Sequence, residues 1–261
     1  MTTLNAWILG VLLVLPSMPP MPQGRTEGRN QITVRARMQD VYFFQGTGAP
    51  DTCRSVLFLP GDGGWRGFAI VIAQTLASWG YDVYAWDTKQ YLESFTGKTP
   101  LTEMEVMSDF RQVAEWIRRG CREPITLVGW SEGAGLCLLA AASEQNKSVL
   151  NGLVALGLTE ENTLGWRWAD YLSYLTNREP SEPSFKSMLY MAQVTPLPIW
   201  MLQSSGDQYV SVDASNRLFA AAREPKRYYL INASNHRFDG NHTELFRLMK
   251  EALESISLGR H

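Results

Sequence analysis

The chain has 261 residues, 45% of them hydrophobic, and its 24 basic and 26 acidic residues give a formal net charge of −2. This length and apolar content favour one large globular domain with a full hydrophobic core. The charge is balanced and forms no basic stripe or block, which argues against a nucleic-acid-binding protein.

The first 29 residues differ in composition from the rest of the chain. Residues 6–15 form an apolar run, and a segment rich in proline and methionine follows at residues 16–22. A run of this length is too short to cross a bilayer of roughly 30 Å, but it is typical of a signal peptide. We therefore interpret residues 1–29 as a signal peptide or N-terminal anchor with a linker, and expect a periplasmic or secreted protein. The alternative is a buried N-terminal helix.

Strands and helices are predicted to alternate along the remaining chain. Residues 31–38 and 41–44 alternate between apolar and polar side chains, which predicts an antiparallel hairpin. The predicted strands that follow are residues 55–59, 81–86, 124–128, 150–156, 198–203 and 227–231. The predicted helices are residues 68–79, 101–119, 134–142, 212–223 and 243–256. This order indicates an α/β fold with a mostly parallel sheet covered by helices on both faces.

Residues 159–195 interrupt this alternation. The segment is rich in aromatic residues and contains two prolines. We interpret it as a cap inserted into a core made of residues 30–158 and 196–261. A cap at this edge of the sheet would narrow access to a site. Its aromatic side chains either contact a substrate or only pack the cap against the core.

The three cysteines are compatible with export. Cys137 lies in a run of small residues and is expected to be a buried free thiol. Cys53 and Cys121 precede two predicted core strands at similar distances. If these strands are parallel neighbours, both cysteines lie at the same end of the sheet, within reach of a disulfide. Two unrelated thiols remain the alternative.

The segment Gly-Trp-Ser-Glu-Gly at residues 129–133 has the pattern of a nucleophile elbow. An apolar strand precedes it and a helix of small residues follows, as the elbow requires. Gly129 and Gly133 leave room for the tight turn, because a side chain at either position would collide with the backbone. Ser131 is therefore the predicted nucleophile.

A nucleophilic serine needs a histidine base and a carboxylate that orients the imidazole. His236 follows the predicted strand 227–231 by a short loop, which would deliver it to the edge of the sheet where Ser131 lies. His242 begins the last predicted helix and His261 ends the chain, so both suit this role less well.

Asp207 follows the predicted strand 198–203 directly and is the candidate carboxylate. One helix and one strand separate it from His236, so both residues would return to the same sheet edge. The competing acids are Asp213, Glu160 and Glu161. The alternative for Asp207 is an aspartate that only forms a turn and has no catalytic role. The chain order of serine, aspartate and histidine is the order found in α/β-hydrolases.

The glycine-rich loop at residues 60–64 follows the strand 55–59 and is the candidate for the second half of an oxyanion hole. We assign the oxyanion donors to the backbone N–H groups of Glu132 and Asp62, with Gly63 as the substitute for Asp62. No lysine follows in the manner of a phosphate-binding P-loop, so a phosphate cradle is disfavoured. The residues expected to contact substrate are Gly63, Trp65, Trp130 and Trp166.

Over about residues 30–257 the chain resembles the VirJ/AcvB group of bacterial virulence-associated proteins within the α/β-hydrolases. Three segments carry the resemblance: Gly-Asp-Gly-Gly-Trp at residues 61–65, the elbow at residues 129–133, and His-Arg-Phe-Asp-Gly at residues 236–240. The resemblance implies export to the periplasm and hydrolysis of aminoacyl esters of phosphatidylglycerol, notably the lysyl ester. The elbow departs from the group, because it reads Trp-Ser-Glu where a Tyr-Ser-Phe type of sequence is expected.

The favoured interpretation is a serine ester hydrolase that needs neither a metal nor an organic cofactor. Its expected partner is a small-molecule or lipid ester, and the oligomeric state stays open. A general carboxylesterase or lysophospholipase is one alternative, and a non-catalytic binding or chaperone-like protein on the same fold is the other. Contact with a membrane surface is a further hypothesis, based on three basic residues of the predicted cap that could meet lipid phosphate or could be ordinary surface charges: Arg167, Arg178 and Lys186.

Overall fold

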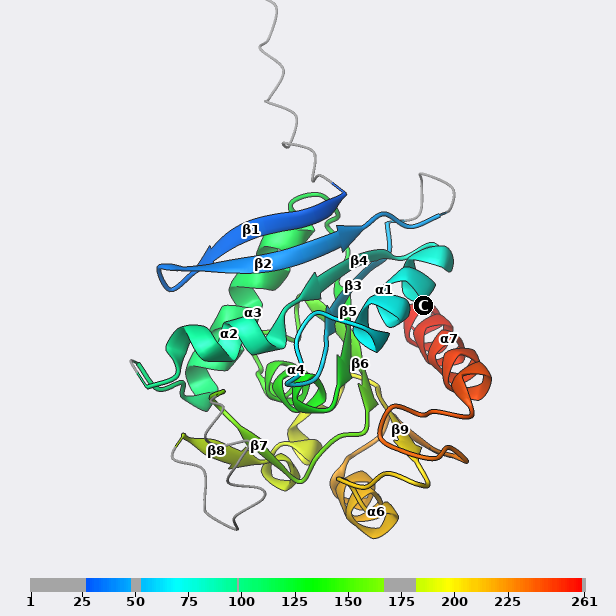
Figure 1. Cartoon of the computed structure of the whole chain (residues 1–261). Coiled ribbons are helices and arrows are strands. Elements are labelled where there is room, and N and C mark those ends of the chain that lie inside the picture. Colours follow the sequence, from blue (N-terminus) through cyan, green and yellow to red (C-terminus); the bar gives the residue numbers. More distant parts are fainter. Residues whose placement is uncertain (1–26, 48–52, 98, 167–181, 260–261) are drawn as a thin grey trace, which may run out of the picture.

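The computed structural model describes residues 27–47, 53–97, 99–166 and 182–259. An eight-stranded sheet in the order β1-β2-β4-β3-β5-β6-β9-β10 forms the centre of the molecule (Figure 1). Its strands are β1 (Gly28–Val34), β2 (Arg37–Phe44), β3 (Ser55–Leu59), β4 (Asp82–Trp86), β5 (Ile125–Trp130), β6 (Leu150–Leu156), β9 (Ile199–Ser204) and β10 (Lys226–Ile231). From β4 to β10 in this order, all neighbouring strands are parallel. Strand β2 runs antiparallel to both of its neighbours, β1 and β4. The predicted α/β architecture is confirmed.

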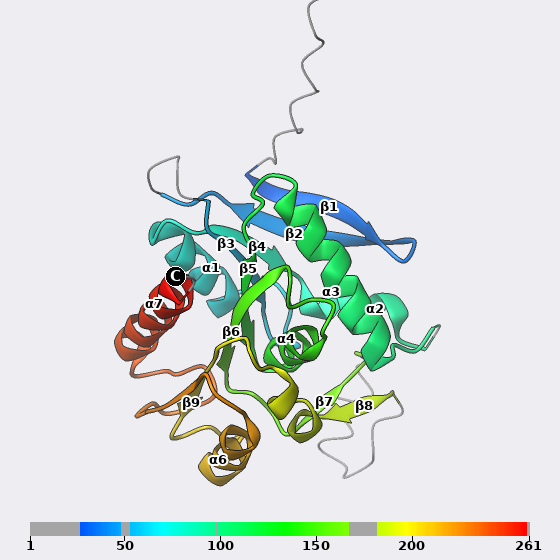
Figure 2. The same cartoon turned by 180° about the vertical axis from the view of Figure 1, so that it is seen from behind.

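Helices cover both faces of the sheet, and the two faces have separate cores. The helices are α1 (Phe68–Ser78), α2 (Thr88–Phe95), α3 (Glu103–Arg118), α4 (Glu132–Ala142), α6 (Val212–Ala221) and α7 (His242–Leu258). Figures 1 and 2 show α1 and α7 on one face and α3 and α4 on the other. The core under α1 and α7 is distinct from the core under α3 and α4. The strands between them are apolar on both sides, which explains their continuous hydrophobic sequences.

The entry hairpin turns earlier than the sequence predicted. We expected a break between residues 38 and 41, but the strands β1 and β2 are joined by Arg35 and Ala36. Both residues adopt left-handed backbone conformations, with φ of 45° and 62°. A two-residue hairpin turn needs such conformations at both positions, and Asn-Gly or Asp-Gly normally signals it. The turn carries no such signal.

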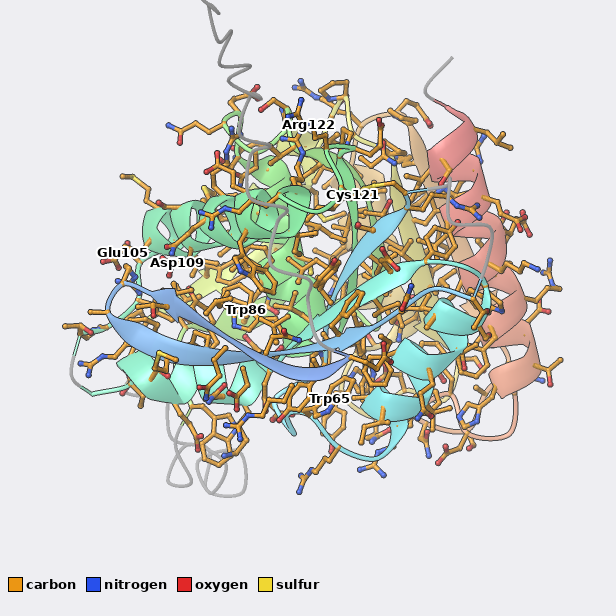
Figure 3. The ribbon with its side chains drawn as sticks, turned by 90° about the horizontal axis from the view of Figure 1, so that it is seen from above. Trp65, Trp86, Glu105, Asp109, Cys121 and Arg122 are labelled. Carbon is orange, nitrogen blue, oxygen red and sulfur yellow. A yellow bond between two sulfur atoms is a disulfide. The ribbon has the colours of Figure 1, made fainter. Side chains whose placement is uncertain are left out.

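Tertiary contacts hold this hairpin turn in place. The Arg35 side chain donates to Asp109 at 3.1 Å and to Glu105 at 2.8 Å, both on α3, and its guanidinium lies 4.0 Å from the ring centroid of Phe95. Figure 3 shows Glu105 and Asp109 beside the hairpin turn. Arg35 is unusual in a left-handed turn, and the contacts of its side chain with the helices stabilise it in this conformation.

Helix α2 was not predicted. Asp87 caps it by accepting hydrogen bonds from the N–H groups of Lys89 and Gln90. Its buried face contains Tyr91, Leu92 and Phe95. The helix has only 8 residues, so its apolar pattern spans little more than two turns.

Part of the inserted segment 159–195 is visible as a small second sheet at its base. Strand β7 (Glu161–Thr163) pairs antiparallel with β8 (Ser184–Lys186), and two short 3-10 turns follow, η1 (Ser187–Leu189) and η2 (Met191–Gln193). The aromatic stretch between β7 and β8, with Arg167 and Arg178, lies outside the described residues from 167 to 181. Its role as a cap stays a prediction.

Cys53 and Cys121 form a disulfide, with their Cα atoms 5.8 Å apart. Strands β3 and β5 are parallel neighbours, so the two cysteines meet at one end of the sheet, as predicted. Cys137 is a buried free thiol on α4, as expected, and burial raises its pKa well above the ordinary value. The proposed signal segment falls almost wholly in residues 1–26, outside the described part. Among the described helices none combines the length and apolarity needed to span a membrane.

Candidate active site

Ser131 occupies the turn between β5 and α4. Its backbone has φ of 57° and ψ of −125°, in the left-handed half of conformational space that β-carbon-bearing residues avoid. Its N–H donates to the Leu156 carbonyl at 2.9 Å, and its own carbonyl accepts from Ala134 at 2.8 Å. These bonds hold the strained serine at the carboxyl edge of the sheet, which is the geometry of a nucleophile elbow.

The glycines flanking Ser131 are required by close backbone packing. A β-carbon on Gly133 would lie 2.3 Å from the Leu59 carbonyl oxygen, and one on Gly129 would lie 2.5 Å from the Gly133 oxygen. The elbow therefore packs directly against the end of β3. This contact brings the glycine-rich loop after β3 next to Ser131, so that a β-carbon on Gly61 would be 3.1 Å from the serine Cβ.

His236 and Asp207 form a buried hydrogen-bonded pair. His236 Nδ1 lies 2.6 Å from Asp207 Oδ2, and the exposed fractions of the two side chains are 7% and 0%. Asp207 follows β9 and His236 follows β10, which are parallel neighbours. This arrangement fixes the imidazole tautomer with its proton on Nδ1 and leaves Nε2 as the basic nitrogen.

The carboxylate of Asp207 is held in its charged form. Burial by itself would raise the pKa of Asp207, but the hydrogen bond and charge of His236 and the N–H groups of Tyr209 and Val210 outweigh this effect and lower the pKa. Those two N–H groups donate to Oδ1 at 2.9 and 3.0 Å. The aspartate can therefore stabilise an imidazolium during a reaction without taking its proton.

Two glutamines that the sequence analysis did not single out support this pair. Gln203 Nε2 donates to Asp207 Oδ2 at 3.0 Å and to the Val210 carbonyl at 3.0 Å. Gln208 Oε1 accepts the backbone N–H of His236 at 3.1 Å. Gln203 is a buried polar residue that directly follows four apolar residues of β9, and this is the signal that could have found it.

His236 lies beside the elbow, but its Nε2 has no hydrogen-bond partner among the residues that the structure describes. The Trp130 indole donates to the His236 carbonyl at 3.2 Å, and the two rings have centroids 6.1 Å apart. Nε2 is buried and makes no hydrogen bond within the described residues. A serine–histidine bond is often absent or long without a substrate and shortens in the reacting complex.

The glycine-rich loop after β3 is positioned by α2. The Thr88 hydroxyl donates to the Pro60 carbonyl at 2.6 Å, and the Gly64 N–H donates to the Gly61 carbonyl at 3.0 Å. In the described part of the chain no acceptor is seen for the N–H groups of Asp62 and Glu132. Their assignment as oxyanion donors stays a prediction.

The other predicted contact residues lie in different surroundings. Trp65 stacks on Tyr42 of β2 with centroids 4.8 Å apart, near the start of α1 (Figure 3). The Arg66 guanidinium approaches Gly63, with Nη2 3.5 Å from where a β-carbon would stand. Trp166 has the Lys89 ammonium 3.8 Å from its ring centroid, at the base of the inserted segment. Only Trp130 of the four contacts His236 through a described hydrogen bond or ring contact.

The competing acids have other partners or are exposed. Glu160 forms a bidentate ion pair with Arg217, and Glu161 accepts from Ser184. Asp213 is exposed in the first turn of α6. His242 stacks on Phe68 with centroids 4.5 Å apart, and His261 lies outside the described residues.

The described residues contain no group of three or more His, Cys, Asp and Glu side chains arranged to hold a metal ion. The chemistry that they do support is that of a serine, a histidine and a carboxylate beside two free backbone donors. This combination is suited to attack on a carbonyl group.

Solved structures with the same architecture include several α/β-hydrolases. Est1E from Butyrivibrio proteoclasticus matches with a TM-score of 0.65 and 15% identity, covering 89% of this chain and 98% of that one. The α/β hydrolase GrgF from Penicillium sp. sh18 matches with a TM-score of 0.67 and 12% identity, over 87% and 98% of the two chains. A monoglyceride lipase from Saccharomyces cerevisiae matches with a TM-score of 0.63 and 14% identity, over 91% and 99%. These similarities establish the α/β-hydrolase fold.

The chain is also similar to proteins known by sequence. An uncharacterized protein of Mycobacterium tuberculosis is 25% identical over 255 residues, which cover 93% of this chain and 84% of that protein. The family model described as bacterial virulence protein (VirJ) matches residues 53–187, from the first cysteine of the disulfide through the elbow to the end of β8. With this match over half of its length, the chain belongs to the VirJ family of bacterial virulence proteins.

Proposed function

We propose that this protein is a serine ester hydrolase in which Ser131 is the nucleophile, His236 the general base and Asp207 the orienting carboxylate. The observation that carries the proposal is a strained serine at the elbow beside a buried, hydrogen-bonded histidine–aspartate pair. A positive φ at a serine costs free energy, so it is retained where the surrounding structure and a function require it.

In the proposed reaction the Ser131 oxygen attacks the ester carbonyl while His236 Nε2 accepts the serine proton. The N–H groups of Asp62 and Glu132 donate to the oxyanion that forms on the carbonyl oxygen. Collapse of this intermediate breaks the bond to the alcohol, which takes the proton from His236. Water then attacks the acyl-enzyme by the same route, giving the acid and free Ser131.

For the substrate we propose an aminoacyl ester of phosphatidylglycerol. Membership of the VirJ family, whose model matches residues 53–187, supports this choice. The separate resemblance of the segment at residues 236–240 to the VirJ/AcvB group supports it as well. A periplasmic or secreted location agrees with such a substrate and is supported by the disulfide, which persists in oxidising compartments. A simpler carboxylic ester or a lysophospholipid is the alternative, since solved neighbours of this fold include an esterase domain from Rhodothermus marinus and a monoglyceride lipase.

A non-catalytic binding protein is the second candidate function. The observation in its favour is that His236 Nε2 has no described partner, so no hydrogen bond to Ser131 is formed. In such a protein the site would bind an ester or acid without turning it over.

Hydrolysis of defined substrates separates these functions. The purified protein is incubated with vesicles containing lysyl-phosphatidylglycerol, with a lysophospholipid and with p-nitrophenyl acetate, beside Ser131→Ala and Asp207→Asn. We expect release of lysine from the vesicles, abolished in Ser131→Ala and reduced about 10⁴-fold in Asp207→Asn, where the imidazole loses its orienting partner. Turnover of p-nitrophenyl acetate alone would overturn the proposed substrate, and no turnover of any ester would favour the binding protein.

A further inference from the structure

The side chain of Glu132 occupies an unusual position for an acidic residue. It directly follows the proposed nucleophile, and the backbone N–H of Thr163 in β7 donates to its carboxyl group. The other interaction that its carboxyl group would need is missing: Oε1 is buried and has no hydrogen-bond partner in the described residues. A buried carboxylate oxygen without a donor is costly, and burial of the neutral carboxyl group costs less than burial of the charge.

Strand β7 is fixed to α4 beside this contact. Asn162 is fully buried and lies so close to Gly135 that a β-carbon there would be 1.9 Å from Asn162 Oδ1. Its amide accepts from the Thr159 hydroxyl at 2.6 Å and donates to the Ser187 hydroxyl at 2.8 Å. The Thr163 N–H is thereby held at a defined place over the first turn of α4. The carboxyl group of Glu132, in the elbow, accepts the hydrogen bond from this N–H.

The surroundings of Glu132 favour its protonated form. Burial, with a smaller contribution from the negative charge of Asp62, raises the pKa of Glu132 to about 8, and the Thr163 N–H opposes the shift only partly. Asp62, in the loop after β3, is the one charged group that acts on Glu132 among the described residues. On β7, Glu161 is bonded to Ser184, and the adjoining Glu160 is paired with Arg217. On α4, the buried Cys137 stays a neutral thiol.

We propose that the Glu132 side chain is a positioning residue that works in its neutral form, joining β7 to the elbow without adding a buried negative charge beside the oxyanion. This inference rests on the proposed function, because it concerns the oxyanion that forms beside Ser131. One carboxyl oxygen accepts the Thr163 N–H and the other carries the proton. Loss of that proton places a negative charge on the residue whose N–H must stabilise an oxyanion, and this opposes the reaction.

The test is the pH dependence of Ser131 labelling by a fluorophosphonate, since phosphonylation develops the same kind of oxyanion. For the wild type we expect the second-order rate constant to fall about tenfold from pH 7 to pH 9. The reason is that the neutral fraction of Glu132, with a pKa of about 8, falls by the same factor over this range. In Glu132→Gln, which cannot ionise, the same ratio should stay within about twofold. The matched control Glu161→Gln removes a carboxylate from β7 and should retain the tenfold fall.

A stability measurement tests the protonation state without any catalysis. Because the ordinary pKa of glutamate is 4.5, the folded protein holds a proton between this value and about pH 8 that the unfolded chain has lost. Stability conferred by the wild-type side chain therefore decreases as pH rises through this window. The Tm of Glu132→Gln minus that of the wild type should increase between pH 5 and pH 8 by about 5 °C or more.

Three results would overturn the inference. The first is an equal tenfold fall in labelling in Glu132→Gln and the wild type, and the second is a Tm difference that does not change with pH. The third is a wild-type protein whose Ser131 does not react at pH 7, which defeats the proposed function and the positioning role together. The Tm curves then still report separately whether Glu132 is neutral.

Discussion

Gly157 determines where His236 and Asp207 can lie. It follows β6 with φ of 57°, and the direction in which a side chain would project is filled by the imidazole. A β-carbon on Gly157 would lie 2.7 Å from His236 Cε1 and 3.5 Å from Asp207 Oδ2. The neighbouring Leu156 carbonyl accepts the Ser131 N–H, so this one strand end contacts all three proposed catalytic residues.

Gly157→Ala should therefore impair the site more than the fold. Displacement of the imidazole by about 1 Å is expected to slow fluorophosphonate labelling about 100-fold. The matched control is Gly67→Ala, at φ of 53° with no atom within 4 Å of the new β-carbon, so it introduces a similar backbone strain without the collision. Rates of labelling and melting curves are compared for both. Equal effects of the two substitutions on labelling would show that His236 is not held by Gly157.

The candidate site could be predicted from sequence only where a residue is marked by its local pattern. Ser131 is marked by two glycines between a strand and a helix, and His236 and Asp207 by their places after two strands. Gly157 has no such mark, because its role depends on a histidine 79 positions away (236 − 157). Gln203 carries a usable signal, because it is a polar residue directly after four apolar residues of β9.

At the scale of the elements, the contact between β7 and α4 joins the inserted segment to the elbow. Gly135 allows the approach, because any side chain there would occupy the place of Asn162. Alanine is the better helix former by about 1 kcal/mol, so helix propensity alone would favour it at this position. The collision with the Asn162 amide, which is fully buried and makes two side-chain hydrogen bonds, should outweigh this gain.

A double-mutant cycle tests this contact. Gly135→Ala is expected to destabilise the protein by about 2 kcal/mol through overpacking. Asn162→Ala removes the colliding amide, so the double variant should be more stable than Gly135→Ala alone. The coupling energy is read from urea unfolding of the four proteins. Strict additivity of the two single effects would contradict the packing described here.

The hairpin turn depends on the Arg35–Asp109 ion pair. Asp109 is 2% exposed and also accepts from the Tyr91 hydroxyl at 2.7 Å. Burial raises the pKa of Asp109, and Arg35 opposes that rise. Removing Arg35 leaves the buried carboxylate without its counter-charge, a change that typically costs several kcal/mol.

We expect Arg35→Met to lower the free energy of unfolding by about 3 kcal/mol at pH 7. The loss should be smaller at pH 4 than at pH 7, because the raised pKa of Asp109 increases the fraction of this side chain that is protonated and needs no counter-charge. Arg247→Met is the control, since its ion pairs on α7 are exposed and should contribute less than about 1 kcal/mol. An Arg35→Met loss that does not change with pH would argue against this ion pair.

Elements with a strong local pattern were predicted almost to the residue. Strand β3 is an apolar run after Ser55, β6 is apolar apart from Asn151, and the predicted bounds of both agree with the structure. The hairpin turn was placed wrongly because Arg35 and Ala36 give no turn signal and are held by α3. Helix α2 was missed because its three apolar residues form too short a pattern, although its Asp87 cap could have been noticed.

At the scale of the whole molecule, the disulfide closes a large part of the chain. It joins residues 68 positions apart at one end of the neighbouring strands β3 and β5. Loop-closure entropy for a loop of this size corresponds to about 4 kcal/mol of stabilisation. We expect Cys53→Ser, or mild reduction, to lower the free energy of unfolding by about this amount. Cys137→Ala should leave the sensitivity to reductant unchanged, and an equal stability of the oxidised and reduced protein would contradict the prediction.

The α/β-hydrolase fold brings three distant segments to one sheet edge: the elbow after β5, the aspartate after β9 and the histidine after β10. This convergence is what makes the chain a candidate enzyme rather than a scaffold, since each segment carries a residue of the type that ester hydrolysis requires. Fold alone does not fix function, so reactivity has to be measured at the serine.

The measurement that tests this account most directly is labelling of the purified protein with a fluorophosphonate, followed by intact mass and peptide mapping. We expect a single adduct on Ser131, absent in Ser131→Ala and formed far more slowly in His236→Ala. A folded protein that forms no adduct, or forms one at another residue, would contradict the claim that Ser131 is an activated nucleophile.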